Sequence, residues 1–282
     1  MKNDKANINI EDIGYMNSYN SINHVRIADD KTPLVLFLGA AYSGKSVTLI
    51  RLIRFLEARC FKAVPDINFR PSEPFYQSWC NEFRKYVFER RETPPGHTIG
   101  DALLIKIFNP TGQIKAQIID IPGEAFFPAQ QNIIRYFIPY IEWIFNRPNK
   151  KIWVFFVEQN WFQNEMERNI FTQRINATHR FMSPKDKVVF LFNKTDKLIN
   201  QYDRYGKPIK ELFFSNIMQE YPGIFSDYQN FGLRRLCFGK YNFQSLCFSA
   251  GNFIKTKEGR EIWINNGDGY CLKLWKAISK YL

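Results

Sequence analysis

Residues 39–46, GAAYSGKS, place a lysine directly after a glycine at the end of an apolar run. Glycines let the backbone wrap closely around an anion, so that several N–H groups can point inward at it. Lys45 can then reach a phosphate oxygen, and the hydroxyl of Ser46 can bind Mg²⁺. The pattern G-x-x-x-x-G-K-S, the Walker A or P-loop pattern, therefore predicts a cradle for the phosphates of a nucleotide.

A second group of candidate residues occurs in the stretch 118–124, IIDIPGE. Asp120 ends an apolar run, and a carboxylate at the end of a strand can hold Mg²⁺, usually through water. The backbone N–H of Gly123 could bind a γ-phosphate, and Glu124 follows it. A plain turn can have the same D-x-x-G pattern, so this stretch gains weight only in the company of the P-loop.

The stretch 188–196, VVFLFNKTD, is an apolar strand that delivers an N-K-x-D pattern. The carboxylate of Asp196 could accept two hydrogen bonds from the N1–H and 2-amino groups of guanine, which adenine cannot supply. Asn193 would tie loops together, and the stem of Lys194 would cover the base. Ordinary turn formation is the alternative explanation for Asn193 and Asp196.

The stretch 246–252, LCFSAGN, is a further strand that ends in Ser249, Ala250 and Gly251. A backbone N–H there, expected to be that of Ala250, could bind the O6 atom of guanine. All four stretches follow predicted strands, and open α/β sheets bind ligands at the carboxyl ends of their strands. Their order along the chain therefore carries more weight than any one of them.

The elements that must position these residues alternate along the chain. Strands are expected at 33–38, 151–157, 187–192 and 241–249, and a hairpin at 102–121. Helices are expected at 45–59, 73–90, 129–146, 162–180, 208–220 and 268–282, with Ser72 and Asp268 as caps. This alternation predicts an α/β fold whose central sheet is mostly parallel, with one antiparallel hairpin strand and helices on both faces. Residues 1–31 are expected to form a flexible or loosely packed arm, and 32–282 one domain with insertions near 60–92 and 200–240.

The amino-acid composition narrows the class of protein further. The chain has 282 residues, of which 45% are hydrophobic, so it can bury a sizeable core. No apolar run is long enough to cross a bilayer, and the N-terminus lacks the apolar stretch of a secretion signal, so a cytoplasmic protein is expected. The five cysteines are odd in number and far apart, which indicates free, buried thiols. The three histidines are too scattered to suggest a metal site.

The net charge of +12 is spread out, without a block of like charges. It could favour nucleic acid, an anionic membrane surface or an acidic partner. General solubility together with a phosphate site explains it more simply, because no nucleic-acid-binding motif accompanies the charge. Aromatic and basic residues interleave in 224–243, where they could stack on bases, form a protein interface or pack in the core.

Taken together, the four motifs resemble those of P-loop GTPases of the translation-factor-related class, which includes Ras-like proteins. The resemblance covers about residues 33–282. More faintly, TPPGHT at 93–98, followed by a hairpin and DIPGE, is similar to the double-GTPase proteins of bacterial conflict systems. The resemblance implies the Ras-like P-loop GTPase fold, Mg²⁺ as cofactor and GTP or GDP as ligand.

Roles for individual residues follow from this resemblance. It implies catalytic roles for Lys45, Thr98, Gly123 and Glu124. The metal would be held by Ser46, Thr98 and Asp120, with Thr93 as an alternative to Thr98. The residues expected to contact the nucleotide are Gly39, Tyr42, Ser43, Gly44, Lys45, Ser46, Val47, Asn193, Lys194, Asp196, Ser249 and Ala250.

The sequence also departs from the GTPase pattern. Glu124 stands where Ras-like proteins carry the glutamine that orients the attacking water, so intrinsic hydrolysis is expected to be slow or to need a partner. Ala41 adds a methyl group in the P-loop, and Gly251 stands where small GTPases usually have lysine. Arg90 or Arg91 could act as a built-in arginine finger, although solvated charges at a helix end are the simpler reading.

The sequence therefore predicts a switch that hydrolyses GTP to GDP and phosphate and that works with a protein partner, either as a monomer or as a dimer. The alternative from another class is a nucleotide-dependent binding module with little or no turnover that docks a protein or nucleic-acid partner. An ATPase is a weaker alternative, since the preference for guanine depends mainly on Asp196.

Overall fold

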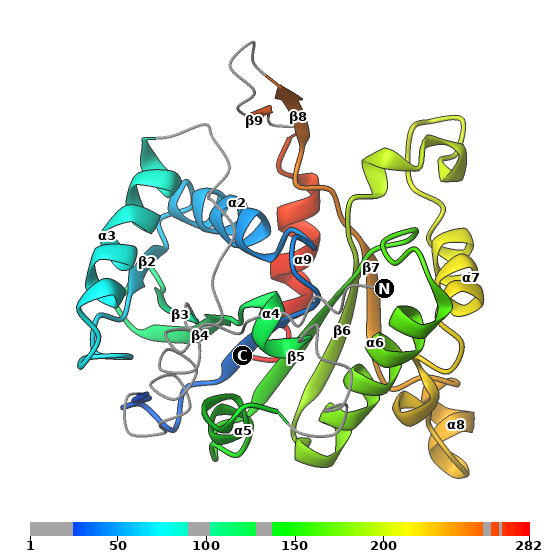
Figure 1. Ribbon diagram of the computed structural model, residues 1–282, viewed down its shortest axis with the longest axis horizontal. Helices are drawn as coiled ribbons and strands as arrows, with labels where there is room; N and C mark the ends of the chain where they lie inside the picture. Colours follow the sequence, from blue (N-terminus) through cyan, green and yellow to red (C-terminus); the bar gives the residue numbers. More distant parts are fainter. Residues whose placement is uncertain (1–24, 90–101, 128–136, 256–260, 265–266) are drawn as a thin grey trace, which may run out of the picture.

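The structure is a computed structural model, which describes residues 25–89, 102–127, 137–255, 261–264 and 267–282 (Figure 1). Its main sheet has seven strands in the order β2-β3-β4-β1-β5-β6-β7. The strands are β1 (Leu34–Leu38), β2 (Lys62–Pro65), β3 (Leu103–Phe108), β4 (Ile114–Asp120), β5 (Lys151–Val157), β6 (Lys187–Phe192) and β7 (Gln244–Cys247).

Strand directions follow the prediction. β1 pairs in parallel with β4 and β5, and β6 pairs in parallel with β5 and β7. β3 is antiparallel to β4, and β2 is antiparallel to β3, so within this sheet β3 alone runs against the rest. The central strands β1 and β5 are buried along their whole length, as expected for parallel strands covered on both faces.

Helices cover both faces of the sheet, as predicted. The α-helices are α2 (Lys45–Glu57), α3 (Pro74–Phe88), α4 (Gly123–Phe126), α5 (Pro139–Phe145), α6 (Glu165–Ala177), α7 (Lys210–Glu220), α8 (Leu233–Phe238) and α9 (Gly269–Ser279). Short 3₁₀ turns lie at η2 (Thr178–Phe181), η3 (Thr195–Lys197), η4 (Ile199–Gln201) and η5 (Ser226–Tyr228). From β1 the chain passes through α2 to β2, at one edge of the sheet. The connections through α5, α6 and α7 each lead to a strand nearer the other edge. Right-handed crossovers therefore place them on opposite faces, and α9 packs beside α2 (Figure 1).

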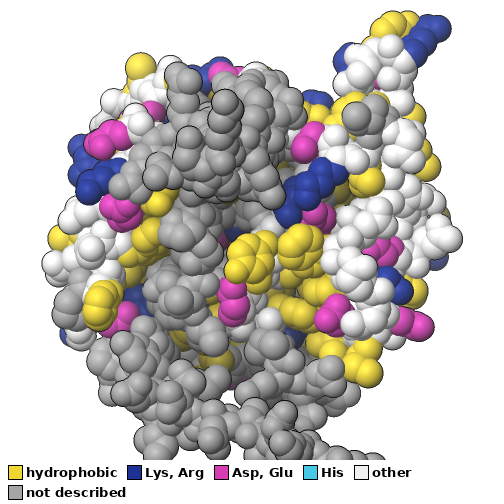
Figure 2. Space-filling model, turned by 45° about the horizontal axis from the view of Figure 1, so that its top comes forward, with side chains coloured by type: hydrophobic (Ala, Val, Ile, Leu, Met, Phe, Trp, Pro, Cys, Tyr) yellow, Lys and Arg dark blue, Asp and Glu magenta, His cyan; other side chains and the backbone are white. Residues whose placement is uncertain are grey.

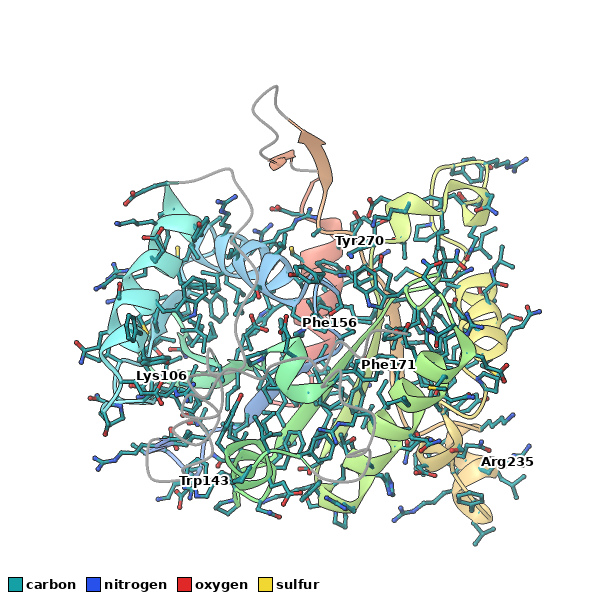
Figure 3. The ribbon with its side chains drawn as sticks, viewed as in Figure 1. Lys106, Trp143, Phe156, Phe171, Arg235 and Tyr270 are labelled. Atoms are coloured by element: carbon teal, nitrogen blue, oxygen red, sulfur yellow. The ribbon has the colours of Figure 1, made fainter. Side chains whose placement is uncertain are left out.

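Aromatic side chains fill much of the core. Trp153 of β5 is fully buried, and its ring centroid lies 4.8 Å from that of Phe145. Phe171 lies on α6 (Figure 3). Its ring centroid is 5.6 Å from that of Tyr221. Such contacts hold α5, α6 and α7 against the sheet and so fix the edge at which the strands end.

One of the two predicted helix caps is wrong. The N-cap residue of α3 is Glu73 rather than Ser72, and Pro74 takes the first helical position, where its missing N–H costs nothing. Asp268 is the N-cap residue of α9, as predicted. Its side chain makes no cap hydrogen bond, and its Oδ2 accepts from Arg59 at 3.1 Å. The predicted helix 129–146 is described only from residue 137, and there it begins at Pro139.

Several elements were not predicted. The short strand β2 adds an edge to the main sheet, and β8 (Asn252–Lys255) and β9 (Glu261–Ile264) form a separate antiparallel pair. Residues 25–31 pack on the domain, contrary to the expectation of a loose arm. Val25 and Ile27 are buried, and the N–H of Arg26 donates to Phe69 O at 2.7 Å. The remainder of the predicted arm, 1–24, lies outside the described residues.

The five cysteines are free, as predicted, but only two of them are buried. Cys80 and Cys271 lie in the core and Cys247 is half-buried, whereas Cys60 and Cys237 are exposed. Across the described ranges, no helix is long and apolar enough to cross a bilayer, and no group of three or more His, Cys, Asp or Glu side chains is placed to hold a metal ion.

Candidate functional site

The loop between β1 and α2 is shaped by close contacts to its neighbours. Gly44 has a φ of 83°, in the left-handed region, and a Cβ atom there would lie 2.6 Å from Asn193 Nδ2. Only glycine meets both conditions without strain. Tyr42 also lies in the left-handed region, with φ of 57°, and its side chain is exposed. The loop thus curls back at residues 42–44 before α2 begins at Lys45.

Lys45 lies at the centre of this curl. Its side chain is buried, and Nζ donates to Gly39 O at 3.1 Å and to Ala40 O at 2.8 Å. An ammonium group has three hydrogens, so this arrangement leaves one for a ligand. Burial lowers the pKa of Lys45 to about 8, against the opposing attraction of Asp120 and Glu124. A poorly solvated cation inside a curled loop favours an anionic ligand.

Ser46 joins the loop to the end of β4. Its Oγ donates to Asp120 Oδ2 at 2.6 Å, although 74 residues separate the two along the chain. Asp120 is buried, and its Oδ1 has no hydrogen-bond partner within the described ranges. A buried carboxylate oxygen without a partner is costly. Hydroxyl and carboxylate oxygens are the hard ligands that Mg²⁺ prefers, so this pair fits the predicted metal.

Gly123 brings the D-x-x-G segment directly onto the loop. A Cβ atom at Gly123 would lie 2.1 Å from Ala41 N and 2.3 Å from Ala41 Cα, so no other residue type fits there. Glu124 follows in the first turn of α4, half-buried, and its charge raises the pKa of Lys45. The segments 120–124 and 39–46 therefore form one continuous surface.

The N-K-x-D segment contacts the other side of the loop. Asn193 Nδ2 donates to Ser43 O at 2.6 Å, and Lys194 Nζ donates to Tyr42 O at 2.7 Å. Both side chains leave the carboxyl end of β6, next to β5 and one strand removed from β1. Asp196 lies two residues farther on, half-buried, in η3.

The loop after β7 is tied to the same network through residues that the sequence analysis missed. Thr195 uses both its N–H and its Oγ1 to donate to Phe248 O, at 3.2 and 3.1 Å. Arg51, buried on α2, donates to Ser249 O at 2.5 Å and to Gly267 O. An arginine among the apolar residues LIRLI at 49–53 was the signal that could have identified it.

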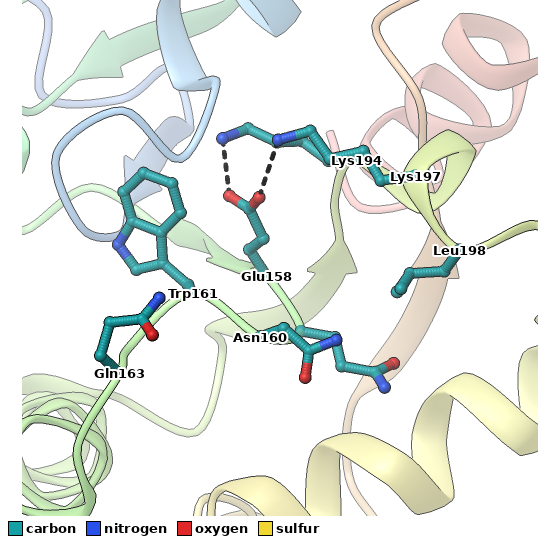
Figure 4. A pocket seen from close by; sticks show the side chains of 8 residues that line it. Glu158, Asn160, Trp161, Gln163, Lys194, Lys197 and Leu198 are labelled. Atoms are coloured by element: carbon teal, nitrogen blue, oxygen red, sulfur yellow. Dashed lines mark ion pairs between the residues drawn. The ribbon is translucent and has the colours of Figure 1, made fainter.

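Glu158 was also missed. It follows β5 and is buried, and its Oε2 lies 2.7 Å from Lys194 Nζ and its Oε1 3.5 Å from Lys197 Nζ (Figure 4). Burial raises the pKa of Glu158, and the two lysines oppose that rise. The ring of Trp161 lies 4.4 Å from Lys194 Nζ, and these groups border a cavity of about 340 Å³. The ammonium of Lys194 is therefore held from three sides, by Glu158, Trp161 and Tyr42 O.

Most of the predicted site residues lie in this region. Those whose contacts join the loop to its neighbours are Gly39, Tyr42, Ser43, Gly44, Lys45, Ser46, Asp120, Gly123, Asn193 and Lys194. Val47 is half-buried in the first turn of α2, and Ser249 and Ala250 are buried after β7. Thr98, Thr93, Arg90 and Arg91 lie outside the described residues.

The architecture can now be named. The strand order around β1, the single reversed strand β3, and the loop between β1 and α2 occur together, with further motifs after β4, β6 and β7. The fold is that of a Ras-like P-loop GTPase. The predicted fold class is confirmed, with β2 as an additional edge strand.

Comparison with known proteins gave similar solved structures but no match to a family model or a curated protein. Similar solved structures include the signal recognition particle receptor SRb-GTP/SRX complex from Chaetomium thermophilum (12% identity, 89% of this chain and 98% of that chain, TM-score 0.46). The S. cerevisiae Ski7 GTPase-like domain bound to GTP is similar too (16% identity, 96% and 52%, TM-score 0.44).

A third similar structure is a bacterial selenocysteine-specific elongation factor, EF-Sec (15% identity, 89% of this chain, TM-score 0.39). The present chain spans only 28% of the length of that factor and about half of the Ski7 chain. All three TM-scores lie below 0.5, so the fold assignment rests on the strand order of this chain alone.

Proposed function

We propose that this protein binds GTP with Mg²⁺ and hydrolyses it to GDP and phosphate, acting as a molecular switch. One observation carries the proposal. The P-loop contacts the D-x-x-G segment through Ser46–Asp120 and the N-K-x-D segment through Asn193–Ser43, so phosphate and base functions adjoin one loop. These three motifs, each expected to bind a different part of a guanine nucleotide, would have no reason to meet in an ordinary turn.

Each residue has a defined part in this proposal. The remaining N–H of Lys45 and the loop backbone would bind the β- and γ-phosphates. Ser46 and Asp120 would hold Mg²⁺, which when bound would neutralise charge on the phosphates. The N–H of Gly123 would bind the γ-phosphate, and Asp196 would select guanine. Bond breaking transfers the terminal phosphoryl group to water, with GDP as the leaving group.

Slow hydrolysis is part of the proposal. Glu124 can accept a hydrogen bond from the attacking water, but its charge opposes the negative charge of the γ-phosphate. Gly123 lies against Ala41, so a movement of the D-x-x-G segment on γ-phosphate binding would change this contact with the loop. Coupling of phosphate entry to movement of residues 120–124 is what a switch needs.

A protein partner fits this proposal better than a nucleic acid. On the face shown in Figure 2, basic and acidic side chains are interspersed over the described residues instead of forming one basic region. Nucleic-acid binding normally requires a continuous positive footprint. The +12 charge alone therefore gives little support to a nucleic-acid role.

Single-turnover hydrolysis tests the proposal. Purified protein loaded with radiolabelled GTP is followed for phosphate release with Mg²⁺ and with excess chelator. We expect release only with Mg²⁺, at about 10⁻⁴ to 10⁻² s⁻¹, the range of intrinsic GTPases. Lys45→Ala should abolish it. Tight GTP binding without phosphate release, with or without candidate partners, would instead favour the alternative of a nucleotide-dependent binding module.

A further inference from the structure

The connection between α7 and β7 carries a projection that the nucleotide site does not use. Residues 230–240, NFGLRRLCFGK, contain α8, and we call them the finger. Their base is closed by two hydrogen bonds from Asn230, whose N–H donates to Lys240 O at 2.8 Å and whose Nδ2 donates to Gly239 O at 3.0 Å. In Figure 1, α8 lies at the outer edge of the molecule, beyond the helix layer.

Four large apolar side chains of the finger are in water. The exposed fractions are 75% for Phe231, 80% for Leu233, 83% for Leu236 and 77% for Phe238. The adjoining aromatic residues behave differently, since Phe225 and Tyr228 are buried and Phe243 packs against the core. The aromatic side chains beside the finger are therefore packed in the domain, whereas the apolar side chains of the finger face water.

The charge of the finger has one sign. It contains Arg234, Arg235 and Lys240 and no acidic residue. None of these three cations forms an ion pair within the described ranges. Figure 3 shows Arg235 at the periphery of the molecule. What covers the finger must therefore accept apolar side chains and supply negative charge.

We propose that the finger inserts into the surface of an anionic lipid bilayer. Leu233 and Leu236 lie three residues apart on one side of α8, Arg234 and Arg235 lie on its other sides, and Phe231 and Phe238 lie at the two ends of the segment. One side of a six-residue helix is much smaller than the about 800 Å² that each partner of a stable protein complex buries. A bilayer interface can take up a short element without a contact area of that size, with aromatic and leucine side chains at the acyl boundary and arginines among the head groups. This attachment goes beyond the proposed function and does not depend on GTP hydrolysis.

Vesicle co-sedimentation of the full chain tests the inference. Vesicles of phosphatidylcholine with about 30% phosphatidylserine are compared with pure phosphatidylcholine, and we expect binding to the first that weakens with salt. Arg234→Gln with Arg235→Gln should weaken it about 25-fold, since each cation near such a surface contributes about 1 kcal/mol. Leu236→Ser with Phe238→Ser should abolish it. The matched control is Phe75→Ser, which changes a side chain that is 80% exposed on α3, and it should bind like the wild type.

A second readout locates the finger directly. Cys237 is an exposed thiol on the finger and Cys60 is an exposed thiol elsewhere. An environment-sensitive dye on Cys237, in a Cys60→Ser background, should shift to the blue with anionic vesicles, and a dye on Cys60, in a Cys237→Ser background, should not. Equal binding by the wild type and the Leu236/Phe238 variant would overturn the inference. So would a dimer that the wild type forms and this variant loses, because a second copy would then cover the finger.

Discussion

At the scale of single residues, Gly123 is the point where the two phosphate-contacting segments meet. Gly123→Ala would place a methyl group about 2 Å from Ala41 N, so the D-x-x-G segment must move away from the loop. We expect GDP affinity to change less than threefold, while single-turnover GTP hydrolysis falls at least tenfold. Labelled-nucleotide titration and phosphate release measure the two effects.

The matched control is Gly269→Ala, at the start of α9. A Cβ atom there meets nothing within 4 Å, and alanine is the better helix former. This variant should hydrolyse GTP like the wild type. If Gly123→Ala also hydrolysed GTP at the wild-type rate, the packing of Gly123 on Ala41 would have no functional weight.

Glu158 is expected to act on the base through Lys194. Removing its charge with Glu158→Gln leaves Lys194 with Tyr42 O and the Trp161 ring as partners, so the lysine that should cover the base becomes less fixed. We expect bound guanine nucleotide to dissociate about five- to tenfold faster, in a stopped-flow chase with unlabelled nucleotide. Glu142→Gln, which removes the surface ion pair to Arg180, should leave the dissociation rate unchanged.

Lys45 makes nucleotide affinity depend on pH. Its pKa is lowered to about 8 in the protein, and a bound polyphosphate would raise it by favouring the ammonium form. Binding therefore takes up a proton when the pH is above about 8, and none well below it. Affinity should be constant from pH 6.5 to 7.5 and fall about tenfold by pH 9. Calorimetry in two buffers of different ionisation enthalpy detects the uptake, and equal affinity at pH 7 and 9 would exclude it.

At the scale of elements, Arg51 connects α2 with the loop after β7. Its guanidinium donates to Ser249 O and to Gly267 O. One side chain therefore links α2, the loop after β7 and the residues just before α9. Arg51→Ala removes both bonds and leaves a buried space. We expect a loss of about 2–4 kcal/mol in the free energy of unfolding, measured with urea, and a weaker preference for guanine.

Arg51→Lys separates the two effects. A lysine keeps the charge but lacks the planar fork that reaches two carbonyls at once. Stability should be partly restored, while guanine preference should stay below that of the wild type. If lysine restored both fully, the fork would not be what positions the loop.

At the scale of the whole molecule, the sheet could be predicted because its strands are buried on both faces. β5 and β6 stand out as unbroken apolar runs, and both were located at their observed bounds. β2 could not be predicted, because KAVP is short and partly exposed, and only its pairing with β3 makes it a strand. Central strands can therefore be predicted from their apolar runs, whereas edge strands are defined by their pairing with a neighbouring strand.

The site was predicted only in part, for the same physical reason. Lys45, Ser46 and Asn193 belong to motifs with fixed spacing, so the sequence shows them. Glu158 and Arg51 act through contacts with residues 36 and 198 positions away, which no spacing reveals. The apolar residues of the finger match those of a buried loop in type, and only the fold shows that they face water.

The central claim is that residues 39–46 and 193–196 bind one guanine nucleotide. Competition binding of GTP, ATP and XTP to the wild type and to Asp196→Asn tests it most directly. The account predicts that the wild type prefers GTP over ATP and XTP by at least 100-fold, and that Asp196→Asn shifts the preference toward XTP, because the amide matches the 2-oxo group of xanthine. Equal binding of GTP and ATP by the wild type, or an unchanged preference for GTP in Asp196→Asn, would contradict it.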